Sequence, residues 1–275
     1  MTALALPYPK LAKGRFASIE AYSDVALYEA MGIRIAFTCR GFGVSDGPYA
    51  SLNLGSHVDD SLDAVFENRR RVLEAFATPD TPLVVPNQVH GDTVLVLSDE
   101  AELEMFRKHA NEGADGLILK DVQAAAMLCY ADCVPVIIVS PSGQFAVVHA
   151  GWRGVMNTIS VKAALRMAQL DQPECGSEAQ RKYNVYIGPH IRRECFETSE
   201  ELHNSFVEKF GSSCDAGYRH IDLSQALITQ LTRAGIDSER ICDLGLCTVC
   251  NNDEFFSYRA QGGIAGRHGA FAYRA

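Results

Sequence analysis

The sequence lacks the features that mark several large classes of protein. Its longest apolar stretches, residues 124–131 and 133–139, are far shorter than the ~20 residues of a membrane-spanning helix. No stretch is rich in Pro, Gly and Ser or carries a long run of one charge, so the composition marks no linker between domains. P-loop and dinucleotide-binding fingerprints are absent, and neither ATP nor NAD is expected. We therefore expect residues 1–275 to form a single domain.

Net charge and cysteine content indicate which partners and which cellular compartment to expect. The formal net charge is −9, which argues against a bulk attraction to nucleic acid or to an anionic membrane. The arginine runs at 69–71 and 192–193 lie in mixed-charge surroundings, and we interpret them as solvated faces first and anion sites second. The 9 cysteines are odd in number and no secretory signal precedes them, so we expect a reducing, cytoplasmic compartment in which thiols bind metal or pack in the core.

Short apolar runs in the centre of the chain, with helical patterns around them, predict a mixed α/β or α+β fold with central sheets flanked by helices. Residues 83–89 and 93–97 read as two strands of a hairpin joined by a tight His-Gly-Asp turn, and the C-terminal segment reads as irregular. The other predicted strands are 32–39, 124–130, 134–139, 144–149 and 184–188, and the predicted helices are 61–77, 98–110, 154–170, 199–210 and 223–234.

Three metal-capable side chains each follow or close a predicted strand: His90, Cys133 and His149. Phe145, Val147 and His149 share one face by the alternation of a strand, and strands that end at one edge can bring such residues to one point. Two imidazoles and a thiolate leave a fourth position open, which is the design of a catalytic zinc site. A single His or Cys at a strand end is more often a packed residue, and these spacings match none of the short zinc motifs.

The segments around these residues resemble one known family. The motifs are GVSDGPYASLNLGSHVD (43–59), NQVHG (87–91), ADCVP (131–135), VHAGWRG (148–154), IGPHI (187–191) and CTVCNNDEFFSYR (247–259). They resemble the YfiH-like or laccase-domain proteins, long labelled polyphenol oxidases and now regarded as purine nucleoside phosphorylases. The resemblance runs from about Ile33 onward and leaves the first ~30 residues as an extension. It implies a YfiH-like fold and a zinc ion bound by His90, Cys133 and His149.

The resemblance also implies phosphorolysis of adenosine, inosine and methylthioadenosine, with adenosine deamination as a further activity. Breaking an N-glycosidic bond develops positive charge on the sugar, so that a bound phosphate serves as nucleophile and as electrostatic partner. The helix start after the HAGWRG histidine, with Arg153, would suit that phosphate, although Arg153 fits a structural ion pair equally well. Trp152 either stacks on a purine or fills core. Arg40 and Asn53 are weaker candidates for substrate contacts, and Asp132 either orients the metal site or caps a turn.

Some features depart from the family pattern. Cys39 and Arg40 stand where the family more often has Thr-Arg, which leaves the contacts of that loop open. Cys247 and Cys250 form a single CxxC pair that no second pair follows, and with Cys242 nearby we expect packing as their role, with redox chemistry behind it.

Two rival functions use the same residues. A metal-free cysteine hydrolase acting on peptidoglycan precursors would take Cys133 as nucleophile and a histidine as base. A non-catalytic zinc-binding regulatory protein would close the metal site with a fourth protein ligand. Copper polyphenol oxidase chemistry is the least favoured, since 8 histidines form no His-x-His pair. The H-x-E and P-C-x-x-C signature of nucleobase deaminases is also absent.

Overall fold

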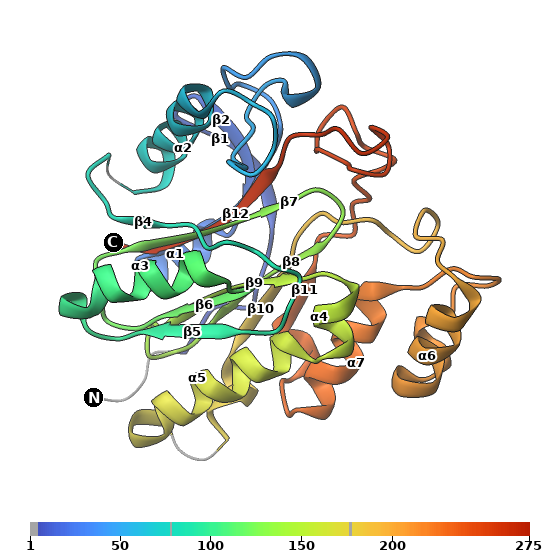
Figure 1. Ribbon diagram of the computed structural model, residues 1–275. Helices are drawn as coiled ribbons and strands as arrows, with labels where there is room; N and C mark the ends of the chain where they lie inside the picture. Colours follow the sequence, from blue (N-terminus) through green and yellow to red (C-terminus); the bar gives the residue numbers. More distant parts are fainter. Residues whose placement is uncertain (1–4, 78, 176–177) are drawn as a thin grey trace.

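Two six-stranded sheets organise the chain in the computed structural model, which describes residues 5–77, 79–175 and 178–275 (Figure 1). The first sheet has the order β1 (Ala12–Phe16), β2 (Ile19–Ser23), β3 (Ile33–Thr38), β12 (His268–Arg274), β7 (Ala125–Tyr130) and β4 (Leu83–Val84). The second has the order β11 (Ile241–Asp243), β10 (Asn184–Ile187), β8 (Val134–Val139), β9 (Phe145–Ala150), β6 (Gly116–Leu119) and β5 (Val94–Leu97).

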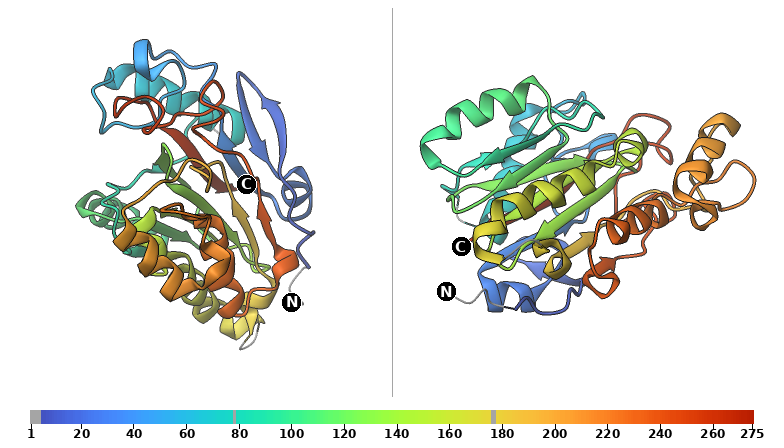
Figure 2. Two further views of the ribbon diagram at one scale, coloured as in Figure 1. Left: turned by 90° about the vertical axis from the view of Figure 1, so that its right-hand side faces the viewer. Right: turned by 90° about the horizontal axis from the view of Figure 1, so that it is seen from below.

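Helices cover the outer face of each sheet (Figures 1 and 2). One helix lies on the first sheet, a group of helices lies on the second, and two helices flank the space between the sheets. In that order they are α2 (Leu62–Phe76); α4 (Trp152–Met156), α5 (Ile159–Cys175), α6 (Glu200–Phe210) and α7 (Leu223–Arg233); and α1 (Val25–Met31) and α3 (Leu103–Glu112). Short 3-10 turns are η1 (Gly47–Tyr49), η2 (Glu100–Glu102), η3 (Ala179–Lys182), η4 (Ser212–Cys214) and η5 (Ser238–Arg240).

Strand alternation divides the core into layers. In β9, Phe145 and Val147 point into the core between the two sheets, whereas Ala146 and Val148 point to the helices on the outer face. His149 has the parity of Phe145 and Val147 and therefore lies on the face between the sheets. The mixed α/β architecture predicted from the sequence, with central sheets flanked by helices, is confirmed.

The predicted hairpin at residues 83–97 is wrong, because β4 belongs to the first sheet and β5 to the second. Pro86 interrupts the apolar run, and the backbone N–H groups beyond it bond outside any strand ladder. Asn87 donates to the Ala110 carbonyl at 2.9 Å, and residues 89–91 donate to the carboxylate of Asp115. The segment is thus a crossover between the sheets.

The C-terminal segment contains a strand that was not predicted. β12 lies inside the first sheet, paired antiparallel with both β3 and β7. Its residues 268–273 are all buried, so the strand shows none of the polar alternation that marks a half-exposed strand. The predicted helix at 154–170 is also divided, since Thr158 adopts a positive φ of 57° between α4 and α5.

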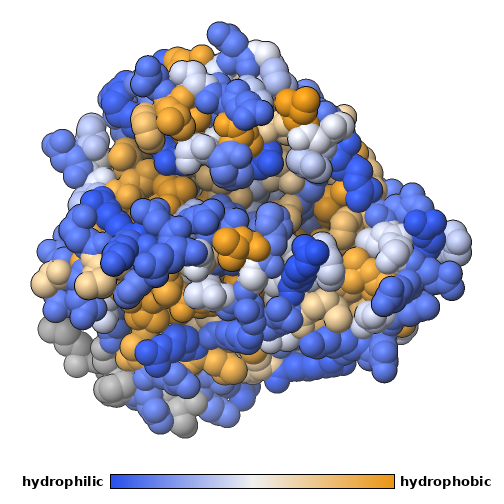
Figure 3. Space-filling model, viewed as in Figure 1, coloured by the Kyte–Doolittle hydropathy of each residue, from blue (hydrophilic) through white to orange (hydrophobic). Residues whose placement is uncertain are grey.

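The surface is mainly hydrophilic in the view of Figure 3, with apolar side chains in the recessed band that crosses this face. Among the described residues, no helix has both the length and the apolar character needed to cross a membrane. The cysteines whose side chains are described are all free thiols: Cys39, Cys129, Cys133, Cys195, Cys214, Cys242, Cys247 and Cys250.

Candidate metal centre

The structure brings His90, Cys133 and His149 together at the junction of the two sheets. One potential ligand atom from each lies within 4.8 Å of the others. His90 lies on the crossover from β4 to β5, Cys133 on the turn that leads from β7 to β8, and His149 near the end of β9. Two of the three donors are therefore on segments that pass from the first sheet to the second.

A buried carboxylate, Asp115, holds two of these segments in place. Its Oδ1 lies 2.7 Å from Nδ1 of His149, so the ring presents Nε2 as its other nitrogen. The same carboxylate accepts the N–H groups of Val89 at 3.3 Å, His90 at 3.1 Å and Gly91 at 2.7 Å. These three donors converge because His90 has a left-handed backbone with φ of 57°.

The electrostatics of the cluster favour an ionised thiol. Burial opposes ionisation of Cys133, but the charge and hydrogen bonds of His149 and His90 outweigh it and lower the Cys133 pKa to about 6. Burial likewise opposes a charged His149, but Cys133 and Asp115 raise its pKa to about 9. The three donors thus include one thiolate, which is the form that binds metal.

Glycine at position 151 keeps the space beside the three donors open. A Cβ built there would lie 3.2 Å from Sγ of Cys133, 3.4 Å from Cδ2 of His90 and 3.7 Å from Cε1 of His149. Gly151 has an ordinary negative φ of −62°, so its backbone conformation does not demand glycine. The combination of two imidazoles, a thiolate and an uncrowded neighbouring position fits a zinc ion.

The cluster opens into a cavity of about 470 Å³, which is in the size range of small-molecule sites. Its wall mixes aromatic and apolar side chains with a few cationic ones. The lining residues besides the three donors are His57, Gln88, Cys129, Tyr130, Ala131, Asp132, Trp152, Ile191, Phe196, Leu223, Tyr258, Arg259 and Arg267.

Asp132 joins the turn before Cys133 to the C-terminal loop. Its carboxylate accepts the hydroxyls of Thr248 and Ser257, each at 2.7 Å, and the N–H of Arg259 at 2.7 Å. The backbone of Asp132 has φ of 90°, a conformation that these bonds hold in place. Asp132 therefore fixes the position of the turn that presents Cys133.

The structure places Arg40 and Arg153 outside the cavity wall. The Arg40 guanidinium donates to the carbonyls of Ala50 at 2.9 Å and Asn252 at 2.6 Å and lies over the ring of Phe256. Arg153 is exposed, with its guanidinium 4.4 Å from the centre of the Trp152 ring. Trp152 itself both lines the cavity and packs against the helical core.

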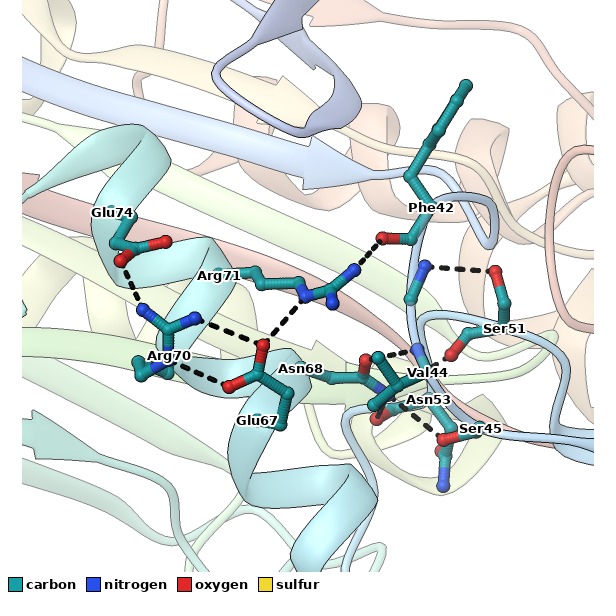
Figure 4. Close-up of polar contacts among 11 residues, drawn as sticks. Phe42, Val44, Ser45, Ser51, Asn53, Glu67, Asn68, Arg70, Arg71 and Glu74 are labelled. Atoms are coloured by element: carbon teal, nitrogen blue, oxygen red, sulfur yellow. Dashed lines mark hydrogen bonds and ion pairs between the residues drawn. The ribbon is translucent and has the colours of Figure 1, made fainter.

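Asn53 is fully buried in a loop network beside α2 (Figure 4). Its Oδ1 accepts the N–H of Gly55 at 3.0 Å and that of Arg267 at 2.8 Å. Asn68 on α2 holds the same loop by donating to the carbonyl of Asn53 at 2.9 Å. Asn53 thus acts on the cavity through the backbone of Arg267.

Two arginines of the run on α2, Arg70 and Arg71, pair with glutamates of their own helix (Figure 4), whereas Arg69 donates to the carbonyl of Leu54 at 2.7 Å. Glu67 accepts from Arg70 at 2.7 Å and from Arg71 at 2.9 Å, and Glu74 accepts from Arg70. Arg71 also donates to the carbonyl of Phe42 at 2.9 Å.

Three residues at this site were missing from the prediction: Asp115, Arg267 and His57. Asp115 has a signal in the sequence, since a lone acidic residue directly precedes the apolar strand 116–119. His57 lies within the 43–59 motif, whereas Arg267 has no signal, because it reaches the cavity from a distant segment that meets Gly55, where a Cβ would lie 2.7 Å from Cγ of Arg267 and 3.3 Å from Cε1 of His57.

The fold and the site together define a class of protein: a two-sheet α/β protein in which two histidines and one cysteine form a candidate metal site, with one coordination position open, beside a cavity. Comparison with known proteins gives the family. A family model described as multi-copper polyphenol oxidoreductase laccase matches residues 34–275. The chain belongs to this family, that of the YfiH-like proteins.

Similar proteins are known from several bacteria. Purine nucleoside phosphorylase YlmD of Geobacillus stearothermophilus is 34% identical over 253 residues, which cover 88% of this chain and 90% of that protein. Purine nucleoside phosphorylase YfiH of Escherichia coli is 33% identical over 232 residues, covering 83% and 88%. The crystal structure of the Bacillus licheniformis hypothetical protein YfiH aligns with a TM-score of 0.80 at 26% identity, covering 93% of this chain and 96% of that one.

Proposed function

We propose that this protein is a zinc-dependent purine nucleoside phosphorylase with adenosine, inosine and methylthioadenosine as substrates and adenosine deamination as a side activity. The observation that carries the proposal is the convergence of His90, Cys133 and His149 within 4.8 Å at the wall of a 470 Å³ cavity. Relatives named purine nucleoside phosphorylases support an enzyme of that kind. The free thiols fit a reducing, cytoplasmic setting.

The reaction needs few covalent steps from the protein. A phosphate oxygen forms a bond to C1′ of the ribose while the bond from C1′ to the purine nitrogen breaks, and the departing purine takes up a proton. A zinc ion held by His90, Cys133 and His149 would act as a Lewis acid that stabilises negative charge. Asp115 keeps the His149 ring oriented, which fixes the direction of its free nitrogen.

The cavity wall offers candidate contacts for the purine and for the phosphate. Trp152 and Tyr258 offer aromatic surface for a purine. We place the phosphate against Arg267, whose Nη1 is held by the carbonyls of Ala265 at 2.7 Å and Gly266 at 2.9 Å while its side chain lines the cavity. Arg267 takes this role instead of Arg153, which stacks on Trp152 at the surface.

The test is purine release from adenosine, inosine and methylthioadenosine, with and without phosphate, on protein of measured zinc content. We expect phosphate-dependent release that rises with zinc content and is lost in Cys133→Ala. Cys242→Ser, a half-buried cysteine outside the cavity, is the matched control and should keep the activity. No turnover by zinc-loaded protein would contradict the proposal and favour a regulatory role.

The rival with structural support is the metal-free cysteine hydrolase. Cys133, His149 and Asp115 stand in the order of a nucleophile, a base and an orienting carboxylate, and the lowered pKa of Cys133 fits a nucleophile. Chelator treatment separates the two functions, because it abolishes a zinc phosphorylase and leaves a cysteine hydrolase active. Among the described residues the cluster contains three donors and no fourth, which favours either enzyme over a closed regulatory zinc site.

A further inference from the structure

A second group of metal-capable side chains lies outside the proposed active centre. Glu194, Cys195, Cys247 and Cys250 each offer a ligand atom, and these atoms all lie within 4.8 Å of one another. Cys247 is buried, Cys195 is half-buried, and Cys250 and Glu194 are exposed, so that the group opens to solvent on one side. The single CxxC pair is thus joined by a thiol that lies upstream of it in the sequence.

The backbone already holds these side chains in position. Cys247 pairs with His190 in an isolated parallel bridge, in which the N–H of Thr248 donates to the His190 carbonyl at 3.1 Å. The N–H of Asn251 donates to the carbonyl of Cys247 at 3.0 Å, which folds residues 247–251 into one turn and puts both CxxC thiols on the same side. Sγ of Cys195 lies 3.5 Å from Sγ of Cys250.

One contact fixes the position of the Cys247 sulfur. Its Sγ accepts the backbone N–H of Arg192 at 3.5 Å. Hydrogen bonds of this kind orient ligating groups around metal ions. The group itself contains no His or Lys that would serve a nucleophilic cysteine as a base.

We propose that Cys195, Cys247, Cys250 and Glu194 bind a structural zinc ion, separate from the ion at His90, Cys133 and His149. Three thiolates and one carboxylate complete a four-coordinate set, and such closed sets are typical of structural zinc. A disulfide would use two of the thiols and leave the third without a partner. Sulfur-rich sites select zinc over magnesium or calcium, which prefer oxygen ligands.

The ion would join two loops that form one side of the cavity. Ile191 and Phe196 lie on the loop that carries Cys195, and Tyr258 and Arg259 lie on the loop that follows Cys250. Arg259 already links the two by donating to the carbonyl of Cys195 at 3.1 Å. Zinc at this place would strengthen that link without contacting a substrate.

The first test is the zinc content of the full chain, purified with a thiol reductant and zinc and without chelator. We expect two zinc equivalents per chain in the wild type and one in the double variant Cys195→Ser, Cys250→Ser. Cys242→Ser should retain both ions, and His90→Ala should retain the second ion while losing the first, which keeps this proposal independent of the proposed function. A double variant with the zinc content of the wild type overturns the proposal.

Cobalt absorption of the wild type gives a test that requires no variant to fold. Three thiolates at this site and one at the other predict a sulfur-to-cobalt charge-transfer band several times stronger than that of a one-thiolate site. The band should persist at most of its strength in His90→Ala. A band of one-thiolate strength in the wild type, or a Cys195–Cys250 disulfide detected by mass in reductant-treated protein, overturns the proposal.

Discussion

Asp115 positions two of the three candidate ligands of the proposed active centre, His90 and His149. It is fully buried, yet its carboxylate accepts hydrogen bonds from the His149 ring nitrogen and from three successive backbone N–H groups around His90. Burial opposes its ionisation, but the hydrogen bond and charge of His149 outweigh burial and lower its pKa. The carboxylate is therefore held in its charged form.

We expect Asp115→Asn to weaken zinc binding at His90, Cys133 and His149 by about 10–100-fold. The amide keeps the shape of the carboxylate but carries no charge and can accept through one atom only, so that His149 and the 89–91 turn lose a shared partner. Competition with a chromogenic chelator measures the affinity. Asp92→Asn, on the same crossover but paired with exposed Lys162, is the control and should leave the affinity unchanged. Equal affinities in Asp115→Asn and wild type would show that Asp115 does not support the site.

Residue patterns singled out the three residues that cluster, but not the residues that surround them. His90, Cys133 and His149 stand out because polar, metal-capable groups at the ends of apolar strands are conspicuous in a sequence. Arg267 carries no such signal, because Asn53, more than two hundred positions away, fixes its place in the wall. Contacts between segments so far apart leave no local pattern.

At the scale of elements, the strands that are continuous runs of aliphatic residues were predicted, and the C-terminal strand of mixed composition was missed. β7, β8 and β9 are continuous apolar runs, and they occur within a residue or two of their predicted positions. β12 consists of small and aromatic residues buried on both faces, and its strand character comes from its place between β3 and β7. The segment from β4 to β5 has the sequence pattern of a hairpin, because the local sequence does not determine which sheet each strand joins.

The close approach of β10 to β3 leads to a prediction about packing. A Cβ at Gly188, directly after β10, would lie 2.4 Å from Cδ1 of Phe37, whose ring is fully buried between the sheets. We expect Gly188→Ala to lower the free energy of unfolding by about 1–3 kcal/mol, because the Phe37 ring has no room to move. Chemical denaturation measures the change. Gly41→Ala, where a Cβ meets nothing within 4 Å, should be close to neutral. A Gly188→Ala protein as stable as Gly41→Ala would contradict this packing.

At the scale of the whole molecule, we expect the burial of His268 to make the fold sensitive to acid. Burial lowers its pKa from 6.5 to about 3. Because the folded pKa lies below the unfolded value, the unfolded chain binds more protons below pH 6.5, and stability falls as the pH drops toward 3. We expect His268 alone to account for a loss of roughly 1.5 kcal/mol in the free energy of unfolding between pH 6.5 and about pH 5.

We expect His268→Phe to reduce this acid loss while keeping an aromatic ring beside Tyr130 and Phe255. Denaturant unfolding at pH 6.5 and at pH 5, on wild type and variant, isolates the contribution of His268 to the pH dependence of stability, because the two proteins share all other titrating groups. Identical pH dependence in the two proteins would show that His268 is not the residue responsible.

The position of β12 inside the first sheet has a consequence for synthesis. A ribosome delivers residues 268–274 after every other strand, yet these residues separate β3 from β7 and join both. Until they emerge, the first sheet is divided into two halves, and the crossovers that carry His90 and Cys133 start from an unfinished sheet. A chain without residues 268–274 would therefore hold the segments of His90 and Cys133 on only part of the first sheet.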